Sequence, residues 1–508
     1  MIIIDKYSHN FCVRDLLPVY LSYVTEFCKQ LIHITFTRRP DGSMERQLNS
    51  IFAFRTDDKR EFRFHINHLQ AFLRFLESKG LTQYELREHH PVCEPATVEF
   101  HMNPNYQLMD YQIPIFNYLV EPGYKKVVEL QPGKGKTVIA LAASNAIKKR
   151  VMLVIKPMYF NRWLETLYGD KHILNLNPNK DVMIVSGSSQ LAGLIDLALN
   201  DQLRAKFIIM SNVTLSNFYN DYKMVGFNDR YGNIHPNDLY QVLGVGIKMV
   251  DESHQDFHRC FVSDLFTHVE KSIELSATLV PDDNFLNEMY KILYPKNLRI
   301  TTDEYDRYTE ILNVTYKFSP YEKPIRATMR GRSDYSQIAY EQGLLKAGKR
   351  FKQFLKLLVD AVRQYYLIPR YEASRLLILA DTVAMCIAVR DHLRTLYPAM
   401  VISKYTSEDD YTVFDTSDIV VSTTKSAGTA IDISNLQTVI SITNRGSKQA
   451  VEQMIGRLRK PKKDEFTPCY VVLVNMDIPA HVRYYHKNHD DLKLKVLRYH
   501  TVNSGCVI

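Results

Sequence analysis

A glycine-rich loop between an apolar strand and an alanine-rich helix constrains the fold of this chain more than any other feature. The strand is expected at Val127–Leu130, the loop reads QPGKGKT over 131–137, and the helix begins with VIALAA. Gly133 and Gly135 allow backbone N–H groups to face inward around phosphate oxygens, and the helix N-terminus adds partial positive charge. A strand, loop and helix in this order favour a parallel sheet wrapped by helices.

The last two residues of the loop predict which ligand it takes. Lys136 is expected to reach the β- and γ-phosphates of a nucleotide, and Thr137 to hold Mg²⁺. Leu130 stands where the strict phosphate-loop pattern has its first glycine, which is a departure from that pattern. The strand and helix around the loop supply the context that a nucleotide site requires.

Two carboxylates follow a later strand, 115 residues after Lys136. The apolar run Ile247–Val250 ends in Asp251 and Glu252, followed by Ser253 and His254. Ligands bind at the carboxyl ends of strands in open α/β sheets. We expect Asp251 to hold Mg²⁺ through its water shell, and Glu252 to orient and deprotonate an attacking water. His254 fits equally a packed histidine and a coupling residue.

Alternating β and α segments extend from residue 106 onward. Apolar strands are predicted at 127–130, 151–155, 207–210, 247–250 and 273–275, and again at 376–380, 418–422, 439–442 and 470–475. This alternation predicts two α/β lobes behind a smaller N-terminal domain. The expected boundaries are 1–105 for an accessory domain, 106–317 for lobe 1, 318–370 for an interlobe connection, 371–482 for lobe 2, and 483–508 for a C-terminal helical tail.

The N-terminal 105 residues carry no phosphate loop and are basic in their middle. A hairpin is predicted from 51–55 and 61–65, turning through 56–59, with a helix over 66–79. The basic residues that gather in this part are Arg38, Arg39, Arg46, Arg55, Lys59, Arg60 and Arg63. They fit either a solvated hairpin surface or an accessory nucleic-acid-binding module.

Composition excludes several classes of protein. The 508 residues include 64 Lys and Arg against 56 Asp and Glu, and the net charge of +8 permits a polyanionic partner without requiring one. Apolar residues make up 45%, which excludes disorder of the whole chain. Seven dispersed cysteines without a CxxC pair fit a reducing compartment. With no apolar run near the ~18 residues of a membrane span, we expect a soluble cytoplasmic protein, in the host cytoplasm if viral, without a membrane partner.

Six motifs, taken in order, resemble those of superfamily 2 (DExH-box) helicases and translocases. They are 108–112 (LMDYQ), 133–137 (GKGKT), 251–254 (DESH), 276–278 (SAT), 427–432 (AGTAID) and 453–460 (QMIGRLRK). The layout of a small domain and two lobes most resembles the phage UvsW-type DNA helicases, which are related to RecG. The resemblance covers roughly residues 106–480. It implies an α/β fold with two tandem RecA-like parallel-sheet lobes preceded by a small α+β accessory domain.

The resemblance also implies an ATP hydrolase with ATP and Mg²⁺ as cofactors. The implied nucleotide-binding residues are Gln112, Gly133, Lys134, Gly135, Lys136, Thr137, Gly428 and Asp432, with Gln112 reading the adenine. The implied coupling residues are Ser276, Thr278 and Thr429. Gln453, Arg457 and Arg459 would act on the nucleotide from the second lobe. Lys460 stands where the family has its last arginine, so Arg457 and Arg459 are both kept as arginine-finger residues.

Nucleic acid is the implied partner, held by phosphate contacts along the strand ends. The expected contact residues are Lys156, Trp163, Thr214 and Thr424. For Trp163, packing in the core is favoured, and stacking on a base or sugar is the alternative. We expect forked, junction or duplex DNA as the partner, branch migration or remodelling of recombining DNA as the role, and a monomer or weak oligomer. An RNA helicase, a duplex-DNA translocase that displaces proteins without unwinding, and a non-catalytic clamp remain as alternatives.

Overall fold

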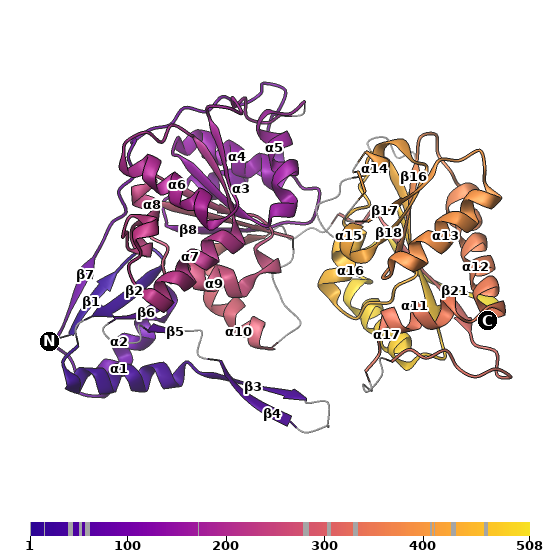
Figure 1. Ribbon diagram of the computed structural model, residues 1–508, viewed down its shortest axis with the longest axis horizontal. Helices are drawn as coiled ribbons and strands as arrows, with labels where there is room; N and C mark the ends of the chain where they lie inside the picture. Colours follow the sequence, from indigo (N-terminus) through magenta and orange to yellow (C-terminus); the bar gives the residue numbers. More distant parts are fainter. Residues whose placement is uncertain are drawn as a thin grey trace. The chain divides into compact units, whose positions relative to one another are not determined.

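The structure, a computed structural model, consists of two compact units, 1–302 and 303–508. It describes the chain except for residues 1, 15, 39–43, 50–52, 56–60, 171, 278–283, 302–305, 329–333, 407–408, 411, 428–432 and 462–465. The first unit contains a mixed N-terminal sheet and a parallel sheet, and the second contains another parallel sheet (Figure 1). Among the described residues, no helix combines the length and apolar character needed to cross a bilayer.

The N-terminal part is an α+β domain. Its described strands form a sheet in the order β5 (Ala53–Arg55), β6 (Glu61–His65), β2 (Asn10–Arg14), β1 (Ile2–Lys6) and β7 (Tyr84–Glu88). Helices α1 (Pro18–Gln30) and α2 (Leu69–Ser78) pack on it through a phenylalanine-rich core. Strands β3 (His33–Arg38) and β4 (Met44–Asn49) form a separate antiparallel hairpin that projects from this domain (Figure 1).

The structure confirms the local elements predicted here and corrects one assignment. β5 and β6 pair antiparallel as expected, while the turn at 56–60 lies outside the described residues. The predicted helix over 66–79 is a 3₁₀ turn at Ile66–His68 followed by α2. Arg63, which we assigned to a basic surface, has an exposed fraction of 0%. This assignment is therefore wrong for Arg63, because its guanidinium is held by buried partners.

One buried polar network joins the N-terminal domain to the parallel sheet of the same unit. Arg63 donates to Asn10 Oδ1 at 2.9 Å and to Asn237 Oδ1 at 3.0 Å, and it pairs with Glu61. The charge on Arg63 is thus satisfied from both domains. The Arg63 pair is part of why the pKa of Glu61 lies well below its usual range, although burial opposes this.

A second buried network is centred on Asp264. Lys125 and Lys248, from two strands of the parallel sheet, pair with its carboxylate, the latter at 2.9 Å. His65 of the N-terminal domain brings its Nε2 within 3.4 Å of the same carboxylate. Burial opposes ionisation of Asp264, but the two lysines hold its pKa well below the ordinary value. The N-terminal domain therefore contacts Asp264 of α9, which in turn pairs with lysines of β8 and β12.

The first parallel sheet carries the phosphate loop and the carboxylate pair at one edge. Its described strands run in the order β10 (Val182–Val185), β11 (Phe207–Ser211), β9 (Val151–Ile155), β12 (Ile247–Val250), β13 (Lys271–Ser276), β8 (Lys125–Glu129) and β14 (Arg299–Thr301). Its helices are α3 (Ile113–Val120), α4 (Lys136–Ile147), α5 (Phe160–Tyr168), α6 (Ser188–Leu199), α7 (Asn212–Val225), α8 (Leu239–Val242), α9 (Phe257–Asp264) and α10 (Asn284–Leu293). Because every pairing is parallel, the residues that follow these strands meet at one edge.

The second unit is a parallel sheet covered on both faces. The described strands run in the order β17 (Ile402–Tyr405), β18 (Ile419–Thr423), β16 (Arg375–Ala380), β19 (Leu436–Ser441), β20 (Cys469–Asn475), β15 (Glu310–Lys317) and β21 (Arg498–Val507). Its helices are α11 (Gln337–Leu345), α12 (Lys349–Val362), α13 (Val383–Leu396), α14 (Val413–Thr416), α15 (Thr424–Ala427), α16 (Lys448–Ile455) and α17 (Pro479–Leu492). Leu376 and Ile378 enter one core and Leu377 and Leu379 the other, as expected for a strand buried on both faces.

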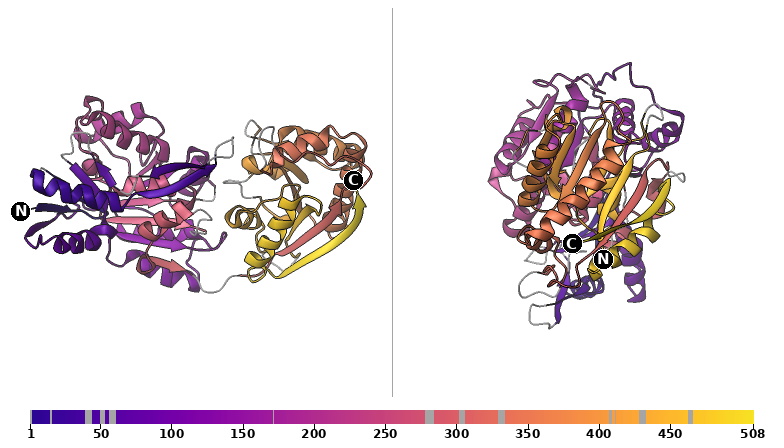
Figure 2. Two further views of the ribbon diagram at one scale, coloured as in Figure 1. Left: turned by 90° about the horizontal axis from the view of Figure 1, so that it is seen from below. Right: turned by 90° about the vertical axis from the view of Figure 1, so that its right-hand side faces the viewer.

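These sheets confirm the expected fold class, but the second one includes segments that we had placed elsewhere. β15, expected in lobe 1, lies between β20 and β21. Within 318–370, α11 and α12 pack into the core of the second unit, so much of this stretch belongs to that lobe. The expected helical tail contains the end of α17 and then β21, which is drawn in yellow at an edge of the sheet (Figure 2).

Candidate active site

The phosphate loop leaves β8 and enters α4 through two glycines with left-handed backbones. Gly133 has φ 86°, and Gly135, the residue that caps α4, has φ 75°. Residues with a Cβ rarely adopt such angles, so the loop requires glycine at both positions. Lys136 Nζ donates to the carbonyl oxygen of Leu130 at 3.0 Å. The lysine amine therefore folds back over the loop, and Thr137 follows it in the first turn of α4.

Gln112 packs directly against this loop. It ends a 3₁₀ turn (Asp110–Gln112) before α3, and its exposed fraction is 4%. Its Nε2 donates to the carbonyl oxygen of Lys134 at 3.1 Å, and its Oε1 accepts from the backbone N–H of Met109 at 3.0 Å. A Cβ on Gly135 would lie 2.4 Å from Gln112 Nε2. The structure thus brings the predicted adenine reader to the phosphate loop.

Asp251 is half-buried directly after β12, with both carboxylate oxygens bonded. Its Oδ2 accepts from Trp163 Nε1 at 3.0 Å, and its Oδ1 accepts from the backbone N–H of Glu252 at 2.9 Å. Burial raises the pKa of Asp251, and the Glu252 charge adds to this, while the charge of Lys136 and the Trp163 bond oppose it. The electrostatic effect of Lys136 on Asp251 indicates that the phosphate loop and the carboxylate pair face a common space.

This arrangement fits the expected Mg²⁺. Two adjacent, half-buried carboxylates repel each other, and a cation would relieve that repulsion. A carboxylate and a hydroxyl are the oxygen ligands that Mg²⁺ prefers. Asp251 and Thr137 are therefore the residues that could hold the ion.

The side chains of Glu252 and His254 link the segment that follows β12 to the end of β13. Glu252 has a left-handed backbone with φ 51°, and its Oε2 lies 3.4 Å from His254 Nδ1. The same Nδ1 lies 2.8 Å from Ser276 Oγ at the end of β13. Burial, reinforced by the charge of Lys136, lowers the pKa of His254 to about 3. The imidazole is thus neutral at physiological pH. The predicted coupling residue Ser276 contacts His254 of the carboxylate segment, which comprises residues 251–256.

The motifs of the second unit are only partly within the described residues. Gln453 lies on α16, Arg457 is buried just after that helix, and Arg459 is half-buried. Lys460 is exposed, with its Nζ 3.9 Å from Asp306. The other predicted motif residues, Thr278 of the first unit and Gly428, Thr429 and Asp432 of the second, lie outside the described residues.

Two of the predicted nucleic-acid contacts face the protein interior. Trp163 has an exposed fraction of 2% and donates to Asp251, so its ring is not available for stacking on a base. Thr214 is buried, and its Oγ1 accepts from the backbone N–H of Gly187 at 2.7 Å. The spacing of Phe160, Trp163 and Leu167, which are all buried on α5, is the sequence signal for the core position of the tryptophan.

Lys156 and Thr424 remain at strand ends in polar surroundings. Lys156, half-buried after β9, donates to Gln255 Oε1 at 3.3 Å. Thr424 follows β18 and donates to Asp381, and Arg445 donates to Thr424 Oγ1 at 2.9 Å. Sequence reasoning missed Asp381 and Arg445, because each follows a different strand and only the sheet order brings them together.

Comparisons with known proteins identify a similar solved structure. No protein-family model matches the chain, and no curated protein matches it. The Hef helicase domain of Pyrococcus furiosus aligns with 75% of this chain and 98% of its own, with a TM-score of 0.43 and 13% sequence identity.

Proposed function

We propose that this protein hydrolyses ATP and couples the hydrolysis to movement along nucleic acid, as superfamily 2 helicases and translocases do. The observation that carries the proposal is the meeting of the phosphate loop and the carboxylate pair at one edge of a parallel sheet, with the charge of Lys136 acting on Asp251. Either motif alone has other uses, whereas the two together make a site that binds phosphates and activates water.

The chemistry follows from the position of each group. The loop N–H groups and the N-terminus of α4 bind the phosphates, and Lys136 exchanges its bond to Leu130 for a phosphate oxygen. Bound Mg²⁺ supplies charge neutralisation on the phosphates, with Thr137 and Asp251 holding it. Glu252 orients the attacking water and accepts its proton, and the neutral His254 holds Glu252 beside Ser276.

The second unit contributes the remaining groups of the proposal. Arg457 supplies planar, delocalised charge for the γ-phosphate, with Arg459 as the second candidate for this role. Gln453 accompanies Arg457 on the nucleotide. Thr278, Gly428, Thr429 and Asp432 couple the nucleotide to the nucleic acid, and Lys156 and Thr424 contact phosphates of the strand.

We further propose DNA, in forked or junction form, as the nucleic acid, and remodelling or branch migration as the outcome. This proposal rests on the resemblance to UvsW-type helicases in the layout of the N-terminal domain and two lobes. Phosphate contacts position a strand without reading sequence, so we expect stimulation by DNA of any sequence.

ATP turnover tests the proposal directly. We expect slow turnover of the protein alone, stimulation by single-stranded DNA and more by a synthetic four-way junction, and loss of turnover in Lys136→Ala and Glu252→Gln. Glu252→Gln should still bind ATP, because it removes only the proton acceptor. Stimulation by RNA alone would overturn the DNA assignment. Equal turnover in wild type and Glu252→Gln would overturn the hydrolytic assignment.

A further inference from the structure

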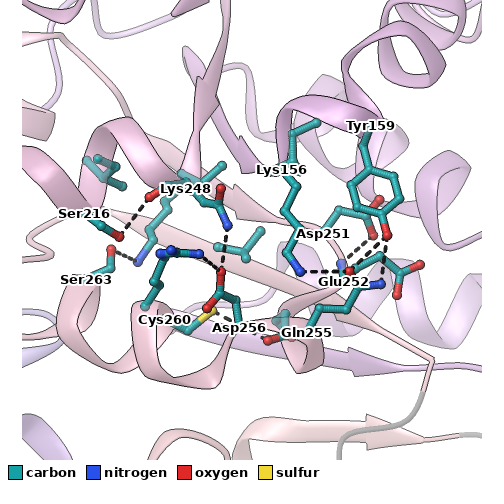
Figure 3. Close-up of a pocket in the computed structure, with 17 residues that line it drawn as sticks. Lys156, Tyr159, Ser216, Lys248, Asp251, Glu252, Gln255, Asp256, Cys260 and Ser263 are labelled. Atoms are coloured by element: carbon teal, nitrogen blue, oxygen red, sulfur yellow. Dashed lines mark hydrogen bonds and ion pairs between the residues drawn. The ribbon is translucent and has the colours of Figure 1, made fainter. Parts of the chain in front are cut away.

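A small cavity lies beside the carboxylate pair, where the segments following three neighbouring strands meet (Figure 3). Its volume is about 30 Å³, which is large enough to admit water. Its lining includes Lys156 and Tyr159 after β9, Asn212 after β11, and Gln255, Asp256 and Arg259 beyond Glu252. Apart from Lys156, none of these residues belongs to the motifs used above.

Gln255 connects the carboxylate segment to the segment after β9. Its Oε1 lies 3.0 Å and its Nε2 2.8 Å from the hydroxyl oxygen of Tyr159, which is buried. The same Oε1 accepts from Lys156 Nζ at 3.3 Å. The position of the Gln255 amide therefore depends on both Tyr159 and the lysine ammonium.

Asp256 makes the corresponding connection to the segment after β11. Its Oδ2 accepts from Asn212 Nδ2 at 2.9 Å and pairs with Arg259 Nη1 at 2.5 Å. Asn212 directly follows Ser211, the last residue of β11. The carboxylate segment is thus bonded to the ends of β9 and β11, two of the three described strands that lie on the far side of β12 from the phosphate loop.

These bonds act close to Glu252. The backbone N–H of Gln255 donates to the Glu252 carbonyl oxygen at 2.9 Å, which closes a 3₁₀ turn directly after the glutamate. Glu252 itself has a left-handed backbone, a conformation that persists in a residue with a Cβ only when its surroundings hold it. A change in the bonds of Gln255 or Asp256 therefore reaches the Glu252 backbone through a single turn.

We propose that Gln255 is a positioning residue that transmits nucleic-acid binding at the end of β9 to Glu252. Lys156, which follows β9, is the group that contacts the nucleic acid, because its present acceptor is a neutral amide oxygen at 3.3 Å. A nucleic-acid phosphate is a stronger acceptor for an ammonium than a neutral amide is. When Lys156 turns to a phosphate, Gln255 loses that donor and the 3₁₀ turn shifts relative to Glu252. The inference rests on the proposed function, whose stimulated ATP turnover it explains.

The test compares the ratio of DNA-stimulated to basal ATP turnover among variants. Gln255→Ala removes the connection, and Tyr159→Phe removes one hydroxyl while keeping the buried ring. The loss of one or two hydrogen bonds predicts a fall in this ratio of about fivefold in both variants. Gln255→Glu places a carboxylate beside Lys156, so it should raise the DNA concentration for half-maximal stimulation. Gln190→Ala is the matched control. Gln190 is an exposed glutamine on α6, and its side chain accepts one hydrogen bond, from the backbone N–H of Ser186.

Each outcome decides between the inference and the function on which it rests. Support is a reduced ratio in Gln255→Ala and Tyr159→Phe, with the KM for ATP and the melting temperature as in Gln190→Ala. A stimulated wild type with the same ratio in Gln255→Ala and Tyr159→Phe overturns this inference alone. A wild type without ATP turnover, or with turnover that no nucleic acid stimulates, overturns the proposed function and this inference with it.

Discussion

Replacing Trp163 by phenylalanine isolates the hydrogen bond that the indole gives to Asp251. The indole Nε1 is 3.0 Å from Asp251 Oδ2, and the ring is buried. Phenylalanine keeps an aromatic ring on α5 but cannot donate, so one oxygen of the half-buried Asp251 carboxylate loses its partner. We expect weaker Mg²⁺ binding and slower ATP turnover.

The size of the effect follows from the kind of bond. A hydrogen bond to an ionised group contributes about 1.5–3 kcal/mol. If the metal-bound state loses the whole energy of this hydrogen bond, the affinity for Mg²⁺ decreases about 10- to 150-fold. The same hydrogen bond also sets the direction in which the pH dependence of ATP turnover should change. The Trp163 bond lowers the pKa of Asp251, so its removal raises this pKa further. The acid limb of the ATP-turnover profile should therefore move to higher pH.

The assay is ATP turnover against Mg²⁺ concentration and against pH, for wild type, Trp163→Phe and Phe160→Leu. Phe160 is buried on the same helix, and Phe160→Leu reduces packing there without removing a donor to Asp251. Unchanged Mg²⁺ dependence and an unmoved acid limb in a folded Trp163→Phe would refute the reasoning. So would equal losses in both variants, because packing alone would then explain them.

Three further predictions concern burial and charge. Arg63→Ala leaves Glu61 without its buried partner and should lower the free energy of unfolding of the first unit by about 3–5 kcal/mol, as measured by denaturant titration. Arg87→Ala removes an exposed pair and should leave the free energy of unfolding nearly unchanged. The folded pKa of His254 is about 3, which is below its unfolded value. The contribution of His254 to stability is therefore present above about pH 6.5 and decreases as the pH falls towards 3. Unfolding titrations of His254→Gln should show a smaller loss of unfolding free energy over this pH range. Arg457→Ala should abolish DNA-stimulated ATP turnover, and a near-normal rate in Arg459→Ala would remove Arg459 from the site.

The fold class could be predicted from the sequence because its signals are local. The loop with Gly133 and Gly135 and the apolar run before Asp251 each lie within about 20 residues, and so does each strand or helix of the alternating pattern. Burial on both faces also leaves a local trace, as in 376–380, where every residue is apolar. Such patterns specify which segments become strands, and parallel pairing then brings the strand ends together.

The remaining features depend on partners that are distant in the sequence. β15 belongs to the second sheet because it pairs with β20 and β21, more than 150 residues later, and no local pattern encodes that choice. The burial of Arg63 depends in the same way on Asn237. Trp163 is an intermediate case, because its helical spacing indicated the core, whereas its bond to Asp251 required the order of the strands.

The polar contacts between the N-terminal domain and the first parallel sheet also have a consequence for biosynthesis. Asn10 bonds to the backbone of Asp264, so 254 residues separate the partners. At about 5–20 residues per second, the ribosome takes roughly 13–50 s to add that length of chain. During this interval the nascent N-terminal domain exposes the polar side chains of Asn10, Arg63 and His65 together with Phe54, which later packs on Tyr222 and Phe266. Because exposed apolar surface is what makes folding intermediates aggregate, the polar groups around Phe54 limit the apolar surface of a domain that is synthesised long before its partner.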